Sequence, residues 1–225
     1  MADGPIPDHP PGKPVLITLA AGTRLCRVHE AGLAPTAFGA MLAPADGPGG
    51  RFDATEADPY PYLYAADDES TAIDEALLRD HPAAAIEAWM LPRAAVRNRC
   101  LSWLETTRPL RLVALRSEPE LAAVGQDEWL VTASARASDR TRAWGHAIRR
   151  FSPRARGFAW PSRRHPQSCT LYIFFGDRTG DGAFRQVETG VALRPGSNRL
   201  DRADGELLLR RILQELRVVL GPETG

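Results

Sequence analysis

The stretch YLYAADDESTAIDE, residues 62–75, decides the fold prediction because it joins a strand directly to a helix. YLYAA is a short apolar run of strand type. DDEST supplies the acidic, Ser/Thr-bearing opening of a helix, and apolar residues follow at helical spacing at Ala72, Ile73, Ala76 and Leu77. The sequence therefore predicts a strand that passes without a long loop into an amphipathic helix.

Upstream of this junction, the sequence predicts strands followed by a loop. PVLITLAAGTRLCRVH, residues 14–29, is typical of one or two strands. Alternation along its second part places Arg27 on the face opposite Cys26 and Val28. Residues 44–61 are rich in Gly, Pro and Asp and contain GGRFD, so they predict a loop of the kind that contacts ligands.

Downstream, helices and strands mix without regular alternation. PAAAIEAWML (82–91) and SDRTRAWGHAIRRF (138–151) predict helices, the latter with an apolar stripe at Ala143, Trp144, Ala147, Ile148 and Phe151. PLRLVAL (109–115), RGFAW (156–160) and CTLYIFF (169–175) predict strands. This irregular order predicts an α+β fold, with a mixed sheet as its core and helices at its flanks.

The chain divides into three expected parts. Residues 1–14 form a proline-rich leader that we expect to be disordered, and residues 15–178 form the catalytic core. Residues 179–225 form a C-terminal extension packed on the core. Within it, residues 183–193 could add a hairpin, and GELLLRRILQELRVVL (205–220) predicts an amphipathic helix that docks on the core or mediates oligomerisation.

Composition argues against several classes of protein. The 28 basic and 28 acidic side chains cancel, which leaves no net field for nucleic acid or an anionic membrane. The three cysteines lack the spacing of a disulfide scaffold or a zinc site, so no metal is expected. No apolar run approaches the length of a membrane span, and we expect a cytoplasmic protein. The motifs GxxxxGK[ST], GxGxxG, HExxH and GxSxG are absent.

Four segments occur in an order that resembles the RES domain, a family named for an Arg, a Glu and a Ser. Leu25, Cys26 and Arg27 match the family's strand of a hydrophobic residue, an aromatic residue and Arg. GGRFD (49–53) matches its Gly-Gly-Arg-Trp-Asn loop and supplies Arg51. Within that loop, Phe and Asp stand where the family has Trp and Asn.

The other two segments supply the Glu and the Ser of the resemblance. Residues 63–66 match the family's Leu-Tyr-Leu-Ala strand, and Glu75 follows Tyr64 at the family's spacing for the acidic residue. Residues 157–162 match a Gly-hydrophobic-x-aromatic-x-Ser segment that ends on Ser162. Arg156 replaces the acidic residue that usually precedes this glycine.

The resemblance implies a fold, a substrate and a bond. RES proteins are similar in fold to ADP-ribosyltransferases, whose cleft holds NAD⁺ in a bent form. The implied substrate is NAD⁺, with no further cofactor, and the implied reaction breaks its nicotinamide–ribose bond. Water as the acceptor makes the protein an NAD⁺ glycohydrolase, inorganic phosphate makes it an NAD⁺ phosphorylase, and a protein side chain makes it a protein ADP-ribosyltransferase.

The same resemblance assigns roles to five residues. Glu75 would stabilise the positive charge that develops on the ribose, although a solvated helix glutamate has the same periodicity. Arg27 and Arg51 would bind the pyrophosphate, since arginine offers forked donors with a fixed charge. Tyr64 would stack on the nicotinamide or ribose, and Ser162 would hydrogen-bond the ribose or orient Glu75. A core tyrosine and a turn serine remain the alternatives.

The resemblance also implies partners. RES toxins are commonly neutralised by an Xre-type helix-turn-helix antitoxin that occludes the cleft, and the C-terminal extension could serve antitoxin docking or homo-oligomerisation. Arg163 and Arg164, beside Ser162, could favour a phosphate acceptor through their charge. A non-catalytic binding module with the RES fold is the alternative class, because Asp53 puts a negative charge beside Arg51.

Overall fold

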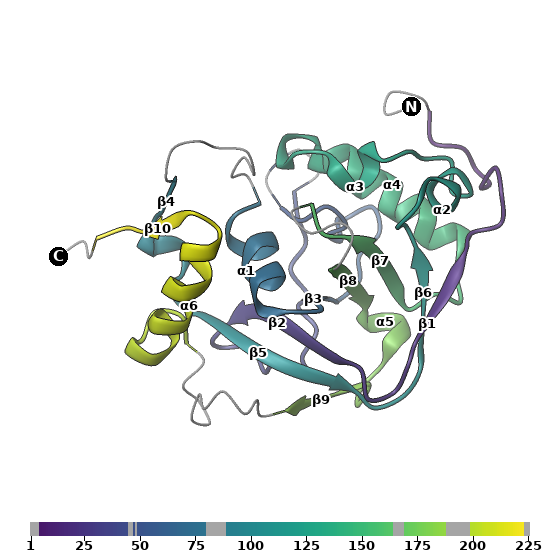
Figure 1. Ribbon diagram of the computed structural model, residues 1–225. Helices are drawn as coiled ribbons and strands as arrows, with labels where there is room; N and C mark the ends of the chain where they lie inside the picture. The colour runs from purple at the N-terminus through teal and green to yellow at the C-terminus, as the bar shows by residue number, and fades with distance from the viewer. Residues whose placement is uncertain are drawn as a thin grey trace.

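The structure, a computed structural model, describes residues 5–44, 47, 49–79, 89–163, 169–187 and 199–222. Its frame is an eight-stranded sheet in the order β1-β6-β7-β8-β3-β2-β5-β9 (Figure 1). β6 and β7 run parallel, and all other neighbouring strands of this sheet run antiparallel. The strands are β1 (Leu16–Leu19), β2 (Arg24–Glu30), β3 (Tyr62–Ala66), β5 (Arg99–Thr106), β6 (Leu110–Ala114), β7 (Gly157–Pro161), β8 (Thr170–Phe175) and β9 (Phe184–Val187).

Helices and a second, small sheet flank this frame. β4 (Trp89–Leu91) pairs in parallel with β10 (Val218–Leu220). In Figure 1 this pair lies beside α6, on the opposite side of the molecule from α2, α3 and α4, and α1 lies between the two groups. The helices are α1 (Glu69–Leu77), α2 (Glu118–Ala122), α3 (Trp129–Thr132), α4 (Ser138–Phe151), α5 (Gly176–Thr179) and α6 (Ala203–Glu215), with short 3₁₀ turns at Arg93–Ala95 and Ala135–Ala137.

The predicted junction between strand and helix is confirmed. β3 ends at Ala66, and the Asp68 side chain caps α1 by accepting a hydrogen bond from the backbone N–H of Thr71 at 2.7 Å. This cap satisfies one of the helix's free N–H groups. Ala72 and Ile73 are buried, so α1 packs on the sheet through its apolar face.

The sheet separates two apolar clusters, as strand alternation requires. Leu25 belongs to the smaller cluster, and its neighbour Cys26 belongs to the larger one. The larger cluster includes Ile73 of α1, Trp144 of α4 and Leu209 of α6. The face of the sheet that carries Cys26 is therefore the face covered by these helices.

The sheet opens between β2 and β3. β2 pairs with β5 along its whole length, from Arg24 opposite Glu105 to Glu30 opposite Arg99. By contrast, its registered pairing with β3 is a single pair, Cys26 opposite Ala66. Because a continuous antiparallel ladder would pair the following residues as well, the two strands diverge beyond Cys26.

Most of the predicted elements are confirmed, and two are wrong in part. The structure contains the predicted strands as β6, β7 and β8 and the predicted helix as α4, in which Ala143 of the predicted apolar stripe is exposed. The helix predicted over 82–91 is wrong at Trp89–Leu91, which form strand β4; residues 82–88 lie outside the described residues. The helix predicted over 205–220 ends at Glu215 as α6, and Val218–Leu220 form strand β10, which pairs with β4. β5 was not predicted at all.

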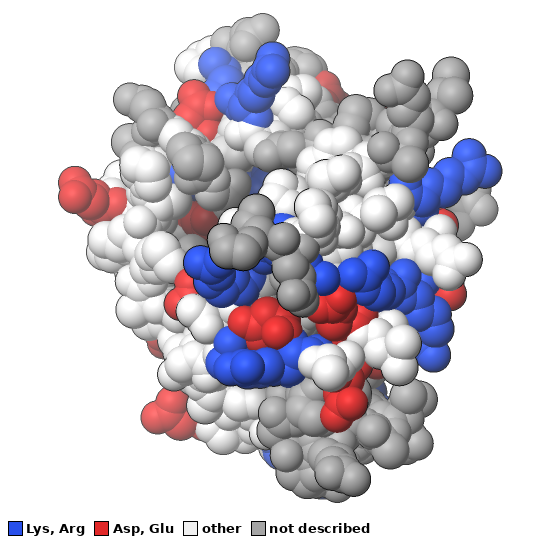
Figure 2. All heavy atoms as spheres, turned by 90° about the vertical axis from the view of Figure 1, so that its left-hand side faces the viewer, with Lys and Arg blue, Asp and Glu red and all other residues white. Residues whose placement is uncertain are grey.

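Ion pairs connect the C-terminal extension to the rest of the fold. Arg93 makes two hydrogen bonds to Glu206 of α6, at 2.7 and 2.9 Å, and Arg211 lies 4.0 Å from Glu69 of α1. Figure 2 shows that acidic and basic side chains are interspersed on this side of the molecule. β9 joins the main sheet through β5, and the rest of the predicted hairpin, 188–193, lies outside the described residues.

Residues 5–14 contain no helix or strand. Among the residues described, no helix combines the length and the apolar character needed to cross a bilayer.

Candidate functional site

A cavity of about 440 Å³ lies where β2 and β3 diverge. Its volume falls within the range of small-molecule sites, roughly 300–1,000 Å³. It is lined by β2, β3, β5, β8, α1, the loop before β3 and the turn before α4. The polar residues of its lining include Arg27, Asp53, Tyr64, Glu75 and Arg79. Three of the five predicted site residues, Arg27, Tyr64 and Glu75, therefore line one cavity.

Arg27 is presented from β2, as predicted, and is buried. Its Nη1 donates hydrogen bonds of 2.8 Å to the carbonyls of Pro35 and Ala37, which fixes the guanidinium beside the cavity. Burial lowers the pKa of Arg27 to about 10, so the group stays charged at neutral pH. Its Nε is buried and has no hydrogen-bond partner in the described part of the chain.

Glu75 faces the cavity from α1 and is half-buried. Burial raises the pKa of its carboxyl above the ordinary value, and the positive charges of Arg79 and Arg51 act in the opposite direction. Glu75 is thus a carboxylate held in a low-dielectric site with arginines nearby. Such a group can stabilise a developing positive charge more strongly than a solvated carboxylate can.

Tyr64 is fixed by its hydroxyl. The hydroxyl donates to Asp53 Oδ1 at 2.9 Å and accepts from the backbone N–H of Phe52 at 3.0 Å. Burial, together with the nearby Asp53 charge, raises the pKa of Tyr64 well above its ordinary value, so the phenol stays neutral. Its ring, rather than its proton, is the part that remains available to a ligand.

Asp53 closes the GGRFD loop on itself. Its carboxylate accepts from the backbone N–H of Gly50 as well as from the Tyr64 hydroxyl. There is also little room at Gly50, because a Cβ there would lie 2.1 Å from Asp53 Oδ1 and 2.7 Å from the Tyr64 hydroxyl. The glycine is therefore needed for the loop to approach β3 this closely.

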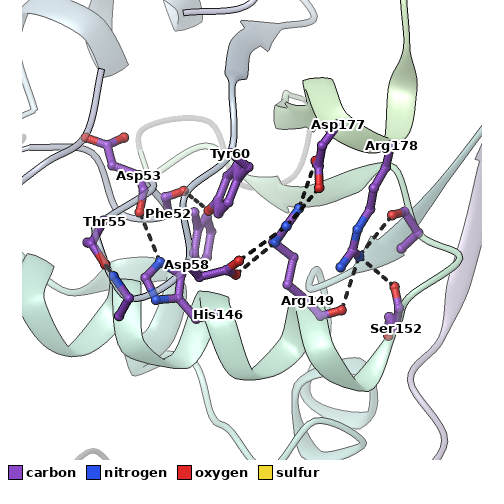
Figure 3. Close-up of polar contacts among 12 residues, drawn as sticks. Phe52, Asp53, Thr55, Asp58, Tyr60, His146, Arg149, Ser152, Asp177 and Arg178 are labelled. Carbon is purple, nitrogen blue, oxygen red and sulfur yellow. Dashed lines mark hydrogen bonds and ion pairs between the residues drawn. The ribbon is translucent and has the colours of Figure 1, made fainter. Parts of the chain in front are cut away.

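A second set of contacts anchors the loop to α4 (Figure 3). The Tyr60 hydroxyl donates to the Phe52 carbonyl at 2.7 Å, and His146 Nε2 lies 3.4 Å from the Asp53 carbonyl. Arg149 donates to Asp58 at 2.9 Å and to Asp177 at 3.0 Å, and its guanidinium carbon lies 4.0 Å from the centre of the Tyr60 ring. These buried polar contacts hold the loop in one conformation against the helix.

Arg51 points away from the cavity lining. It is fully buried, and its guanidinium donates to the carbonyls of Leu130 at 2.9 Å and Ala133 at 3.1 Å, at the end of α3. Burial lowers its pKa to about 10, while the negative charge of Glu75 raises it. Arg51 is thus close enough to Glu75 for the carboxylate to raise its pKa, but its two terminal nitrogens bind backbone carbonyls.

Ser162 lies beside a different cavity. It is buried, and it lines a space of about 610 Å³ together with Arg116, Glu128 and Arg163. The two cavities adjoin through Arg163, whose Nη1 donates to the Arg79 carbonyl at 3.1 Å. Ser162 is therefore near the Glu75 cavity but is not part of its lining. Arg164, the other member of the predicted basic pair, lies outside the described residues.

Arg79 lines the cavity, and the sequence interpretation missed it. It follows α1 and donates from Nη1 to the Gly49 carbonyl at 2.8 Å. Its charge lowers the pKa of Glu75. The signal was available in the sequence, because Arg79 stands four residues after Glu75, the spacing of neighbours on a helix surface.

Unpaired arginine donors cluster around this cavity. Six buried side-chain nitrogen or oxygen atoms lack a hydrogen-bond partner among the described residues. Four of them are donors of Arg27, Arg51 and Arg79. Native proteins rarely leave buried donors unpaired without a functional reason, and a positively charged donor calls for an anionic acceptor.

Comparisons with known proteins identify the family and the fold. The family model described as RES domain matches residues 24–191. The chain therefore belongs to the RES domain family, and the predicted membership is confirmed. A comparison with curated proteins found no match.

The fold is similar to that of a solved structure. It matches a chain of the crystal structure of the M. tuberculosis MbcT–MbcA toxin–antitoxin complex with a TM-score of 0.54 and 17% sequence identity. The match covers 89% of this chain and 91% of that chain. The predicted α+β fold, a mixed sheet with flanking helices, is confirmed by the structure and by this likeness.

Proposed function

We propose that this RES-domain chain is an NAD⁺-cleaving enzyme and the toxin of a toxin–antitoxin pair. The observation that carries the proposal is the cavity in which Glu75, Tyr64 and Arg27 meet, bordered by arginines with unpaired donors. Such a site suits a ligand that carries both an aromatic ring and phosphates. The similar fold in a toxin–antitoxin complex supports the biological role.

Glu75 is the proposed catalytic carboxylate. When the bond between the nicotinamide nitrogen and the ribose carbon breaks, its electron pair leaves with nicotinamide and positive charge develops on the ribose. A half-buried carboxylate stabilises that charge most strongly in the transition state, which is where catalysis requires it. Tyr64 would pack its fixed ring on the nicotinamide or ribose.

The arginines are proposed to hold the pyrophosphate. Arg27 lines the cavity directly, so it is the proposed contact on the β2 side. Arg51 would act through its charge alone, because it is fully buried, does not line the cavity and binds the carbonyls of Leu130 and Ala133. Ser162, in the adjoining cavity, would reach the ribose or Glu75 only after a change of its surroundings on ligand binding.

The acceptor defines which enzyme this is. In glycohydrolysis the ribose carbon bonds to a water oxygen, a proton is released, and the products are nicotinamide and ADP-ribose. In phosphorolysis it bonds to a phosphate oxygen. Transfer to a protein side chain would make the protein an ADP-ribosyltransferase instead.

The alternative function, a non-catalytic binding module with the RES fold, is not favoured by the contacts of Asp53. It rested on Asp53 as a negative charge beside Arg51. In the structure, Asp53 binds the Gly50 N–H and the Tyr64 hydroxyl, and the Arg51 guanidinium is directed to α3. The carboxylate therefore serves the loop and does not neutralise the arginine.

A toxin of this kind needs a neutralising partner. We propose an Xre-type antitoxin that covers the opening of the cavity, and a cytoplasmic site of action, where NAD⁺ is abundant. Co-expression of this chain with the product of a neighbouring antitoxin gene should restore growth, and the complex should consume no NAD⁺.

The decisive experiment is NAD⁺ turnover by the purified chain, with and without inorganic phosphate, alongside Glu75→Gln and a matched control, Glu215→Gln. Glu215 is exposed on α6, so its replacement removes the same charge far from the cavity. Glu75→Gln should lower turnover by roughly a hundredfold, the effect of losing one well-placed electrostatic contact. Glu215→Gln should leave it unchanged.

Growth provides the second readout. Expression of the wild-type chain alone should arrest growth and lower cellular NAD⁺, and expression of Glu75→Gln should not. Normal growth with unchanged NAD⁺ at confirmed soluble expression would overturn the toxin proposal.

A further inference from the structure

Arg79 has unused hydrogen-bonding capacity at the cavity. Its Nη1 donates to the Gly49 carbonyl, while its Nε and Nη2 are buried and have no hydrogen-bond partner among the residues that the structure describes. A guanidinium carries five donors in a fixed fork. Nε and Nη2 lie on one edge of that fork, the edge that binds two oxygens of one anion.

The charges around Arg79 leave room for such an anion. Burial raises the pKa of the Glu75 carboxyl, and the charge of Arg79 acts in the opposite direction. Arg27 and Arg99 also line the cavity, and Arg99 pairs with Glu30 at 3.7 Å. Asp53 is already bonded to the Gly50 N–H and the Tyr64 hydroxyl. A bound anion would supply the acceptor that Nε and Nη2 of Arg79 lack among the described residues.

Arg79 also makes hydrogen bonds with two segments of the chain beside the cavity. Its side chain reaches the GGRFD loop at Gly49, and its backbone carbonyl accepts a hydrogen bond from Arg163. The loop itself is fixed by Asp53 and Tyr64. The unpaired edge is thus held in place before any ligand arrives, which lowers the entropic cost of binding.

We propose that Arg79, which lies outside the RES motif, binds a phosphoryl group of the ligand through Nε and Nη2. The proposal rests on the proposed function, because that function names the cavity as the NAD⁺ site. Two sources offer the same chemistry, the pyrophosphate of NAD⁺ and free inorganic phosphate as the acceptor. The experiment must therefore separate them.

The test is calorimetric binding to Arg79→Gln, Arg79→Lys and a surface control, Arg111→Gln. Arg111 is exposed on β6 and does not line the cavity, so its replacement removes one positive charge elsewhere. The probes are NAD⁺, nicotinamide riboside, which has no phosphate, and inorganic phosphate. Thermal unfolding of each variant reports separately on the loss of the contact with Gly49.

If Arg79 binds the pyrophosphate, Arg79→Gln weakens NAD⁺ binding about tenfold or more, the cost of a lost charge-assisted hydrogen bond, and leaves nicotinamide riboside unaffected. If it binds the acceptor, inorganic phosphate loses affinity and NAD⁺ does not. In either case Arg79→Lys recovers only part of the affinity, because a point charge cannot form the fork. Arg111→Gln matches the wild type.

A folded Arg79→Gln or Arg79→Lys protein that binds NAD⁺ and phosphate as the wild type does would overturn the proposal and leave Arg79 a structural link to Gly49. Wild-type binding without NAD⁺ turnover would contradict the proposed function and leave the Arg79 proposal standing. A wild-type chain that binds none of the probes would overturn both.

Discussion

The Tyr64 hydroxyl donates to Asp53 Oδ1 at 2.9 Å, and this bond joins strand β3 to the GGRFD loop, both of which line the cavity. The same hydroxyl accepts from the Phe52 N–H, so one phenol fixes two consecutive residues of the loop. An aspartate at position 53 is therefore compatible with an ordered site. Its carboxylate accepts hydrogen bonds from the Gly50 N–H and the Tyr64 hydroxyl.

We expect Tyr64→Phe to lower stability and to loosen the loop while keeping the ring. The change leaves the Asp53 oxygen and the Phe52 N–H short of a partner in a buried place, which costs about 1–3 kcal/mol. Thermal unfolding measures this cost, at about 2–4 °C for each kcal/mol in a domain of this size. The KM for NAD⁺ should also rise, since the loop lines the cavity.

The matched control is Tyr172→Phe. The Tyr172 hydroxyl donates to Asp67 at 2.8 Å, and its ring belongs to the smaller apolar cluster, away from the cavity lining. Tyr172→Phe should lower the free energy of unfolding by an amount similar to that of Tyr64→Phe, with no change in the KM for NAD⁺. An equal rise of KM in both variants would show that the effect comes from lost stability and not from the loop.

Arg51 leads to a different expectation. Because its guanidinium binds the carbonyls of Leu130 and Ala133, Arg51→Met should destabilise the fold as well as weaken NAD⁺ binding. Hydrogen bonds to charged groups contribute about 1.5–3 kcal/mol each, but removing a buried charge offsets part of the loss. We expect a net loss of about 1–3 kcal/mol, measured by denaturant unfolding.

An exposed arginine provides the comparison for Arg51. Arg154 lies in the turn after α4, and Arg154→Met should change stability by less than about 0.5 kcal/mol. Unaltered stability of Arg51→Met would mean that the contacts with α3 contribute nothing. The effect of Arg51→Met on NAD⁺ binding would then come only from the loss of its positive charge.

Local signals explain what the sequence could predict. The passage from β3 into α1 depends on the cap at Asp68 and on apolar spacing that includes Ile73, all within one short stretch. Glu75 and Arg27 follow from their elements, since helix and strand periodicity set the faces that they occupy.

Long-range contacts explain what the sequence could not predict. Trp89–Leu91 form a strand because Val218–Leu220, far along the chain, pair with them, and a pairing over this distance leaves no local signal in the sequence. The sequence did not predict β5, because this strand contains a buried polar residue, Ser102. The Ser102 hydroxyl lies 2.9 Å from His29 Nε2. Polar residues at buried positions break the apolar alternation that identifies a strand.

The anchor of the loop on α4 can be tested at Arg149. It is buried, pairs with Asp58 and Asp177, and lies over the rings of Tyr60 and Phe175 (Figure 3). Arg149→Gln leaves Asp58 and Asp177 without their cation, but Asp177 is 39% exposed and stays hydrated, so we expect destabilisation of about 1–3 kcal/mol. Chemical denaturation in urea measures it.

The double variant Arg149→Gln with Asp58→Asn serves as the control. It removes one of the two carboxylates left without a partner, and it should therefore recover part of the stability lost in Arg149→Gln. Strict additivity of the two changes would show that Arg149 and Asp58 do not interact energetically. Their 2.9 Å contact would then contribute nothing measurable.

The last prediction concerns the pH dependence of Glu75. Burial raises the pKa of its carboxyl, and the proposed mechanism needs the ionised form. Activity should therefore be lost as the pH falls through the raised pKa, so the acid limb of the kcat/KM profile lies above the ordinary glutamate pKa of about 4.3. Stability changes in the opposite sense. The folded state holds the Glu75 proton more tightly than the unfolded state does. This contribution to stability is complete below the unfolded-state pKa and is lost as the pH rises through the folded-state pKa.

Because the charge of Arg79 lowers the pKa of Glu75, Arg79→Gln should move the acid limb of the kcat/KM profile to still higher pH, whereas Arg111→Gln should not. The measurement is kcat/KM for NAD⁺ from pH 4 to pH 8 for the wild type and both variants. An acid limb at the ordinary glutamate pKa, unmoved by Arg79→Gln, would mean that the titrating group is not Glu75.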